Sequence, residues 1–194
     1  ADVSNVLISP MEEGEISIPR YGSITAVPSF TVIAAQNPYD DVGTVRVSKA
    51  FMDRVCLIKM EYQNKEEEQE IVKRRTGVLH PDITGLAVDM VRRTREHSDL
   101  KVGASVRGAI DLVDLLTGLQ QMDNRIEHNL LLAARMALSN KIWLSEMTEK
   151  NTDEIVEEIL ESLKLQFPDL IKSNEPLPPE SLQTDTDDDL PSET

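Results

Sequence analysis

The hydrophobic and polar positions divide the chain into a first third with short apolar runs and a longer part with helical spacing. From residue 62 onward, apolar residues recur every three or four positions, the spacing of helices with one buried face. The predicted helices cover residues 62–75, 83–95, 105–119, 125–144 and 151–163. Turn and capping residues separate them: Asn64, Ser105 and Asn151 stand at predicted starts, and Gly77 stands at a predicted end.

The first 60 residues show strand patterns instead. Phe30–Ala35 and Val55–Met60 are short, apolar and rich in β-branched residues, which predicts two buried strands. Residues 15–26 alternate around the turn sequence Pro-Arg-Tyr-Gly, which predicts a β-hairpin. The run at 30–35 stops before Asn37 and Pro38, so the Asn37 amide is expected at the carboxyl end of a strand, where open α/β sheets bind ligands. Short helices are expected over residues 1–13 and 48–53.

Charge is concentrated at the C-terminus. The net charge is −15, and residues 151–194 carry 13 of the 35 acidic groups with only Lys164 and Lys172 as bases. The other 150 residues are nearly balanced, so we expect no surface for nucleic-acid phosphates. Residues 175–194 hold four prolines, seven acids and no base, a composition that predicts a disordered tail.

Metal and thiol chemistry have little support in the sequence. The single Cys56 lies inside a predicted strand, where it is expected to act as a small buried hydrophobe. His80, His97 and His128 lack ligand-like spacing with one another or with Cys56, so no metal site is expected. No apolar run approaches the ~20 residues that a membrane span needs, and with one cysteine a reducing, cytoplasmic location is expected.

Three polar residues at the ends of predicted elements are the candidates for chemistry. Asn37 follows a strand, Arg54 closes a short helix after Asp53, and Arg107 stands in the first turn of a helix that begins after Ser105. An amide can orient a water molecule, and a planar, permanently charged guanidinium suits phosphate oxygens. An arginine in a first helical turn opposes the helix dipole, which favours a role in binding an anion.

These residues resemble the second half of an AAA+ ATPase core of the MoxR group. The resemblance rests on Asn37-Pro38, on Gly43-Thr44, on Asp53-Arg54 and on the segment Gly-Ala-Ser-Val-Arg ending at Arg107. It implies that Asn37 is the sensor-1 residue that places the attacking water and that Arg54 is a finger reaching a neighbouring subunit's nucleotide. It also implies that Arg107 is the sensor-2 residue that contacts nucleotide phosphates. The family has Pro where this chain has Val106.

The resemblance implies an α/β fold: a partial AAA+ P-loop NTPase core over residues 1–62, an all-α lid over 63–170 and a disordered acidic tail over 171–194. It implies ATP and Mg as cofactors, a homo-oligomeric ring with the six subunits expected for the family, and a partner protein with a von Willebrand A domain. No G-x-x-x-x-G-K-[ST] motif occurs, so we expect the chain to be the C-terminal part of an ATPase, with the phosphate-binding loop before Ala1. Alone, it is expected to be inactive.

Two alternatives stay open. One is a non-catalytic helical module that binds a partner through its acidic tail or its hairpin, and the other is a magnesium-chelatase-like AAA+ subunit. The acid-rich run at 65–70 is expected to be a solvated helix face, and the basic cluster at 92–95 is expected to lie at the surface of a fraying helix end.

Overall fold

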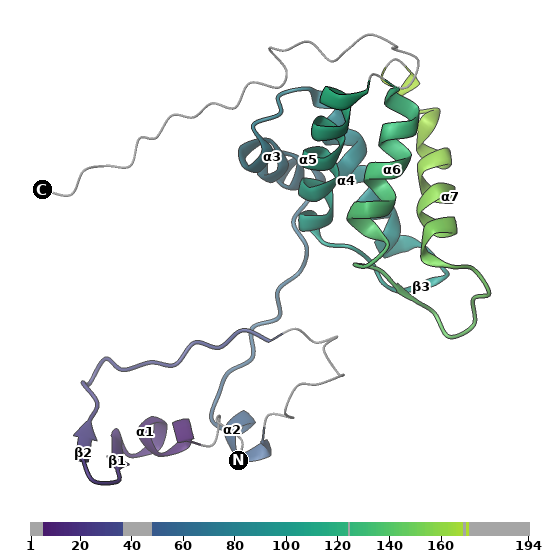
Figure 1. Ribbon diagram of the computed structural model, residues 1–194. Helices are drawn as coiled ribbons and strands as arrows, with labels where there is room; N and C mark the ends of the chain where they lie inside the picture. The colour runs from purple at the N-terminus through teal and green to yellow at the C-terminus, as the bar shows by residue number, and fades with distance from the viewer. Residues whose placement is uncertain (1–5, 37–47, 124, 169, 171–194) are drawn as a thin grey trace, which may run out of the picture. The chain divides into compact units, whose positions relative to one another are not determined.

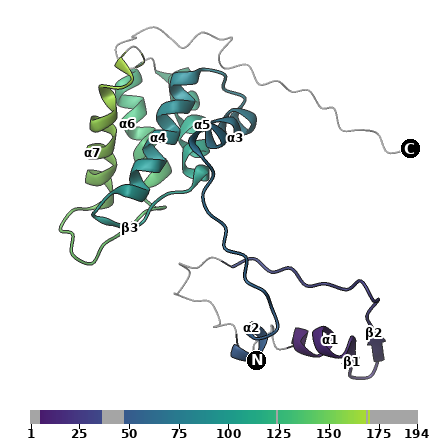
Figure 2. The same ribbon diagram turned by 180° about the vertical axis from the view of Figure 1, so that it is seen from behind.

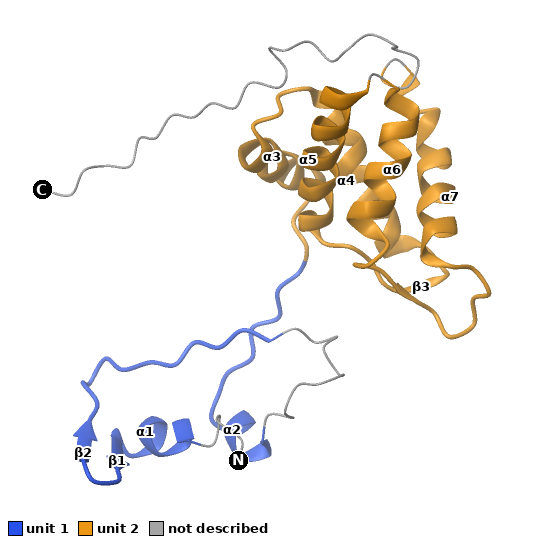
Figure 3. Cartoon of the chain, viewed as in Figure 1, with its two compact units in different colours: residues 1–61 blue, residues 62–194 orange. Residues whose placement is uncertain are grey.

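The computed structural model describes residues 6–36, 48–123, 125–168 and 170. The chain divides into two compact units, residues 1–61 and residues 62–194, which Figure 3 draws in different colours. The described architecture is mixed, with helices and two small two-stranded sheets. Asn37, the Gly43-Thr44 loop and the acidic tail lie outside the described residues.

The described part of the first unit is built from short elements. These are α1 (Ile8–Glu12), β1 (Glu15–Ile18), β2 (Gly22–Thr25) and α2 (Lys49–Met52). The predicted hairpin is confirmed, because β1 and β2 pair antiparallel in a register that sets Ile18 opposite Gly22. Both Arg20 and Gly22 in its turn have positive φ angles, which glycine adopts at little cost.

The prediction of buried strands at 30–35 and 55–60 is wrong for this structure. Neither segment pairs with another described strand, and most of their apolar side chains face solvent, with Ile33 94% and Leu57 82% exposed. A strand is stable only when a neighbour satisfies its backbone N–H and C=O groups, and no described segment supplies that neighbour. Cys56 is exposed as well, so the prediction that it is a buried hydrophobe is also wrong.

The second unit is a helical bundle, seen from opposite sides in Figures 1 and 2. Its elements are α3 (Lys65–Thr76), α4 (Pro81–Glu96), β3 (Leu100–Val102), α5 (Val106–Met122), α6 (Ile126–Leu138), β4 (Trp143–Leu144) and α7 (Thr152–Lys164). The α5 helix contacts α3, α4 and α6, and α7 packs on α4 and α6. The motif ending at Arg107 therefore leads into a helix that contacts three other helices of the bundle.

The predicted caps set the ends of these helices. Asn64 and Asn151 each accept a hydrogen bond from the backbone N–H three residues later, and a glutamate at that position bonds back, so both starts are complete capping boxes. Gly77 ends α3 with a φ of 69°, the left-handed conformation that favours glycine. These local predictions are confirmed.

Aliphatic side chains fill the bundle core. The largest fully buried hydrophobic side chains are Ile83, Leu86, Met90, Leu112, Leu116, Leu130, Leu138, Ile155, Leu160, Leu163 and Val72. They come from α3, α4, α5, α6 and α7 and form one cluster. Burying each such side chain contributes about 1.5–3 kcal/mol, so this cluster accounts for the cohesion of the second unit.

Two predicted helix ends differ from the structure. The α4 helix does not fray at 92–95 but continues to Glu96. The helix predicted over 125–144 ends at Leu138, and Trp143 and Leu144 form β4, which pairs antiparallel with β3. Ser139 and Asn140 follow the last helical residue, and such side chains compete with the helix for backbone hydrogen bonds. No helix in the described ranges combines the length and apolarity that crossing a membrane requires.

Candidate functional site

The segment that leads into α5 is fixed by close contact with the end of α4. A Cβ atom on Gly103 would lie 2.6 Å from both the Cα and the backbone N of Arg95, so only glycine fits there. The Ala104 N–H donates to Thr94 Oγ1 at 2.8 Å, and the Ala104 carbonyl accepts from Arg95 Nε at 2.8 Å. Both backbone polar groups of Ala104 are thus held by α4, and the position of the first turn of α5 follows from that.

A second glycine, Gly108, lets the first turn of α5 pack closely against α6. A Cβ on Gly108 would lie 2.8 Å from Leu138 Cδ2 and 3.2 Å from the Ala104 Cβ. The absence of a side chain lets the start of α5 approach the end of α6 closely. Gly103 in the motif and Gly108 immediately after it are therefore packing residues on either side of Arg107 in the sequence.

Arg107 itself is exposed in the first turn of α5. Among the described residues it has no ion-pair or hydrogen-bond partner. The acidic residue one turn further on, Asp111, is paired with Lys141. Lys141 also donates to the Ala137 carbonyl at 2.9 Å, which holds its ammonium group against the end of α6.

The electrostatics around Arg107 favour an anion. Arg107 is the second residue of α5, where the first backbone N–H groups of a helix have no acceptor within it. Of these groups, the Gly108 N–H donates to the Ser105 carbonyl at 2.8 Å. The N-cap residue Ser105 makes no side-chain capping bond. A positive side chain at the N-terminus of a helix is unfavourable, because the helix dipole is positive at that end, and a bound anion relieves the repulsion. Phosphate is an anion that helix N-termini commonly bind. The site can therefore bind phosphate through Arg107 and the adjacent N–H groups.

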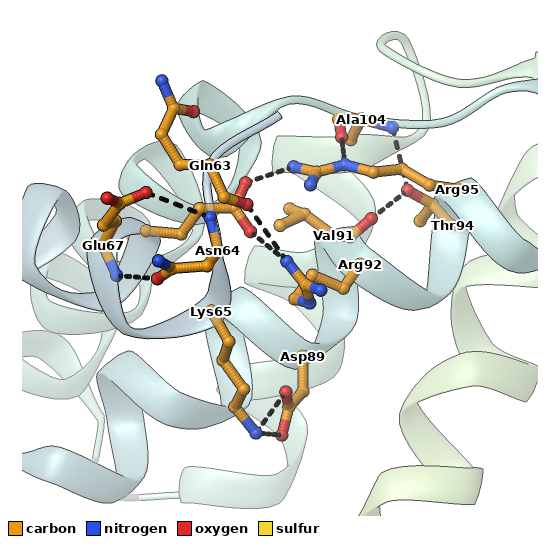
Figure 4. Close-up of polar contacts among 11 residues, drawn as sticks. Gln63, Asn64, Lys65, Glu67, Asp89, Val91, Arg92, Thr94, Arg95 and Ala104 are labelled. Atoms are coloured by element: carbon orange, nitrogen blue, oxygen red, sulfur yellow. Dashed lines mark hydrogen bonds and ion pairs between the residues drawn. The ribbon is translucent and has the colours of Figure 1, made fainter. Parts of the chain in front are cut away.

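A buried ionic network lies behind the Arg107 turn, and the sequence did not predict it. Glu68 in the first turn of α3 is fully buried. Arg92 Nη1 donates to its Oε2 at 3.0 Å, and Arg95 Nη2 donates to its Oε1 at 2.7 Å. Figure 4 shows these arginines reaching from α4 together with the bonds to Ala104. The acid run at 65–70 is thus not wholly a solvated face, and the basic cluster at 92–95 is not wholly a surface cluster.

The network extends to the residues where the chain enters the helical unit. The Arg95 guanidinium carbon lies 3.8 Å from the centroid of the Tyr62 ring, and Arg92 Nη1 donates to the Gln63 carbonyl at 3.4 Å. Lys65 and Asp89 form a further ion pair between α3 and α4 at 2.7 Å. One signal in the sequence could have indicated the network: Arg92 and Arg95 are three residues apart and so share a helix face.

Arg54 lies just after α2 in the first unit. Its Nη2 donates to Glu12 Oε1 at 2.5 Å and its Nη1 donates to the Ala50 carbonyl at 2.5 Å. The Arg54 side chain is 29% exposed and that of Glu12 is 50% exposed. An ion pair this open to solvent stabilises the fold by at most about 1 kcal/mol. Arg54 and Arg107 belong to different units and Asn37 is outside the described residues, so their meeting at one nucleotide stays a prediction.

Metal ligands are not gathered in the described part of the chain. No group of three or more histidine, cysteine or acidic side chains there is arranged to hold an ion. Arg107 and the N-terminus of α5 fit the phosphates of a nucleotide, but we assign no ligand for Mg²⁺ among these residues.

Comparison with known proteins places the chain among ATPase relatives. It is 30% identical over 129 residues to the gas vesicle ATPase GvpN of Haloferax mediterranei, covering 63% of this chain and 36% of that protein. It is 29% identical over 126 residues to the gas vesicle ATPase GvpN2 of Halobacterium salinarum, covering 62% of this chain and 35% of that protein. The chain is a distant homologue of gas vesicle ATPases. No protein-family model matches it.

A third relative aligns over more of the chain. The uncharacterized protein YeaC of Bacillus subtilis is 24% identical over 194 aligned positions, which cover 83% of this chain and 60% of YeaC. The chain thus spans little more than a third of the gas vesicle ATPases it matches and three fifths of YeaC.

Proposed function

We propose that this chain supplies the sensor-1 residue, the arginine finger and the helical lid of an AAA+ ATPase of the MoxR type. In this function Arg107 binds nucleotide phosphate from the lid, Asn37 orients the attacking water, and Arg54 reaches the nucleotide of a neighbouring subunit. The observation that carries the proposal is the exposed Arg107, which has no partner among the described residues and stands at the N-terminus of a tightly held helix.

Two further findings support it. The homology to proteins named ATPases makes hydrolysis of ATP the natural chemistry for a phosphate site of this kind. The pairing of Asp111 with Lys141 removes the nearest acid on the same helix face as a competitor for the Arg107 guanidinium.

Arg54 needs an argument of its own, because it is paired with Glu12. That pair is largely open to water, so exchanging the Glu12 carboxylate for a phosphate costs little free energy. A triphosphate carries more negative charge than a carboxylate and accepts both arms of a guanidinium. The Glu12 pair is therefore compatible with a finger that engages a nucleotide when subunits assemble. The ring, and a client complex that the motor remodels, belong to the proposal through the family resemblance.

The test uses the complete ATPase module that includes this chain. Arg54→Ala is expected to lower ATP turnover by about 10³-fold while ATP still binds, because a finger acts on the transferring phosphate. Arg107→Ala is expected to weaken ATP binding in each subunit. The matched control is Arg74→Ala, which removes an exposed arginine whose pair is Glu70 on its own helix. Normal hydrolysis by Arg54→Ala in an assembled ring, or unchanged ATP affinity in Arg107→Ala, would refute the proposed roles.

A further inference from the structure

Arg95 contacts chain segments on both sides of α4: Tyr62 and Glu68 precede that helix, and Ala104 follows it. It stands in the last turn of α4, and its side chain is 12% exposed. Its Nη2 bonds Glu68 of α3, its Nε bonds the Ala104 carbonyl, and its guanidinium plane covers the Tyr62 ring. Nε and Nη2 therefore have different hydrogen-bond partners, and Figure 4 shows the bond from Arg95 to Ala104.

The buried carboxylate of Glu68 holds that guanidinium in one orientation. Glu68 is 0% exposed, and its second oxygen is taken by Arg92. A planar guanidinium that donates to a fixed carboxylate has little rotational freedom, so the direction of its Nε–H is fixed too. The direction of that N–H is what sets the position of the Ala104 carbonyl.

The position of Ala104 decides where Arg107 stands. Ala104 is 1% exposed, and Thr94 and Arg95 hold its N–H and its carbonyl from the same turn of α4. Arg107 follows three residues later, within the first turn of α5. A shift of the Ala104 peptide therefore moves the Arg107 backbone directly, with no flexible segment between them.

We infer that Arg95, oriented by the buried Glu68, is a positioning residue that sets the place of Arg107 for phosphate binding. Arg95 also contacts Tyr62, the first residue of the helical unit, so the start of this unit and the Ala104 segment pack on the same side chain. The inference rests on the proposed role of Arg107 in binding nucleotide. It goes beyond that role because it assigns a function to Arg95 and Glu68, to which the proposed function gives no contact with the nucleotide.

The decisive variant is Arg95→Lys. Lysine keeps the positive charge beside Glu68, but a single ammonium cannot bond Glu68 and the Ala104 carbonyl in the fork geometry that arginine provides. Thr94→Val is the second variant, because it removes the acceptor of the Ala104 N–H at nearly constant volume. The matched control is Arg93→Lys on the same helix, whose side chain bonds Ser162 of α7 instead.

Two measurements on the complete ATPase module distinguish the effect on the first turn of α5 from the effect on ATP binding. Amide hydrogen exchange reports whether the first turn of α5 has loosened. The dissociation constant for ATP, measured with and without the Arg107→Ala change, reports whether that loosening acts through Arg107. We expect Arg95→Lys to speed exchange over residues 104–110 and to weaken ATP binding roughly tenfold, with no further weakening when Arg107 is already alanine. Thr94→Val is expected to act in the same direction, and Arg93→Lys to leave both quantities unchanged.

The outcomes separate the inference from the function on which it rests. Unchanged exchange over 104–110 in both Arg95→Lys and Thr94→Val overturns the positioning role. An equal loss of ATP affinity with and without Arg107 also overturns it, because the effect would then be general instability of the fold. Faster exchange together with full ATP affinity in Arg107→Ala supports the structural link and refutes the proposed role of Arg107 itself.

Discussion

Replacing Gly103 with alanine tests how tightly the Arg107 motif is held. The new Cβ would lie 2.6 Å from Arg95 Cα, 2.6 Å from Arg95 N and 2.7 Å from the Thr94 carbonyl carbon. Ordinary contacts between carbon atoms lie at about 3.5–4.0 Å. All three neighbours are backbone atoms in the last turns of α4, so no rotamer change can relieve the overlap.

The magnitude follows from the size of that overlap. Overpacking in a well-packed region costs about 1–3 kcal/mol, and a clash with backbone belongs at the upper end. The loss of glycine's freedom in the unfolded chain offsets roughly 0.4–1 kcal/mol of this. We therefore expect Gly103→Ala to lower the free energy of unfolding by about 2 kcal/mol and the Tm of the helical unit by roughly 8 °C.

The assay is thermal unfolding followed by far-ultraviolet circular dichroism, which is dominated by the helices of the second unit. Gly118→Ala is the matched control, because Gly118 lies inside α5 and a Cβ there meets no atom within 4 Å. Alanine is favoured over glycine in a helix by about 0.8–1 kcal/mol, so this control is expected to raise the Tm by about 3 °C. A Gly103→Ala protein with an unchanged or higher Tm would refute the close approach of α4 to the motif.

Three further substitutions test the bundle. The pKa of Asp114 is raised, first by burial and then by the charge of Asp111, so the charged form of Asp114 destabilises the fold above that pKa. Asp114→Asn should therefore raise the Tm at pH 7, and the gain should vanish as the pH falls toward the ordinary aspartate pKa of 3.8. A constant difference across that range would contradict this. Asn151→Ala removes the capping box of α7 and should cost about 1 kcal/mol in urea unfolding, whereas a loss below about 0.3 kcal/mol would argue against the cap. Leu130→Ala empties a fully buried position and should cost about 2–5 kcal/mol, unlike the partly exposed Leu132→Ala on the same helix.

The features that could be predicted from the sequence are those set by neighbours along the chain. Asn64, Gly77 and Asn151 mark helix ends because the hydrogen bonds of a cap join residues within one turn. The hairpin at 15–25 is local in the same sense, since its register follows from a short turn. The place of Arg107 in a first helical turn was likewise predictable, because Ser105 marks the start of the helix two residues earlier.

The conformation of the segments at 30–35 and 55–60 is not set by neighbours along the chain. Their apolar, β-branched composition indicates what a strand contributes, but the pairing of a strand is decided by its neighbours in the sheet. Leu57, Ile58 and Met60 are each at least 80% exposed. Composition therefore predicted that these segments favour the β-strand conformation, but it did not predict that they remain unpaired and exposed in this structure.

The three consecutive glutamates of α3 show why the network escaped prediction. Glu66 is exposed, Glu67 completes the capping box with Asn64, and Glu68 is buried against two arginines of α4. Successive helix positions are about 100° apart, so each carboxylate faces a different environment although the local sequence is the same. Burial of an ionised carboxylate is tolerated only when charges and hydrogen bonds compensate it, and here the compensation comes from residues 24 and 27 positions away. The residue that orients Arg95, and through it the Arg107 turn, can thus be distinguished from its two neighbours only when the packing of α3 against α4 is known.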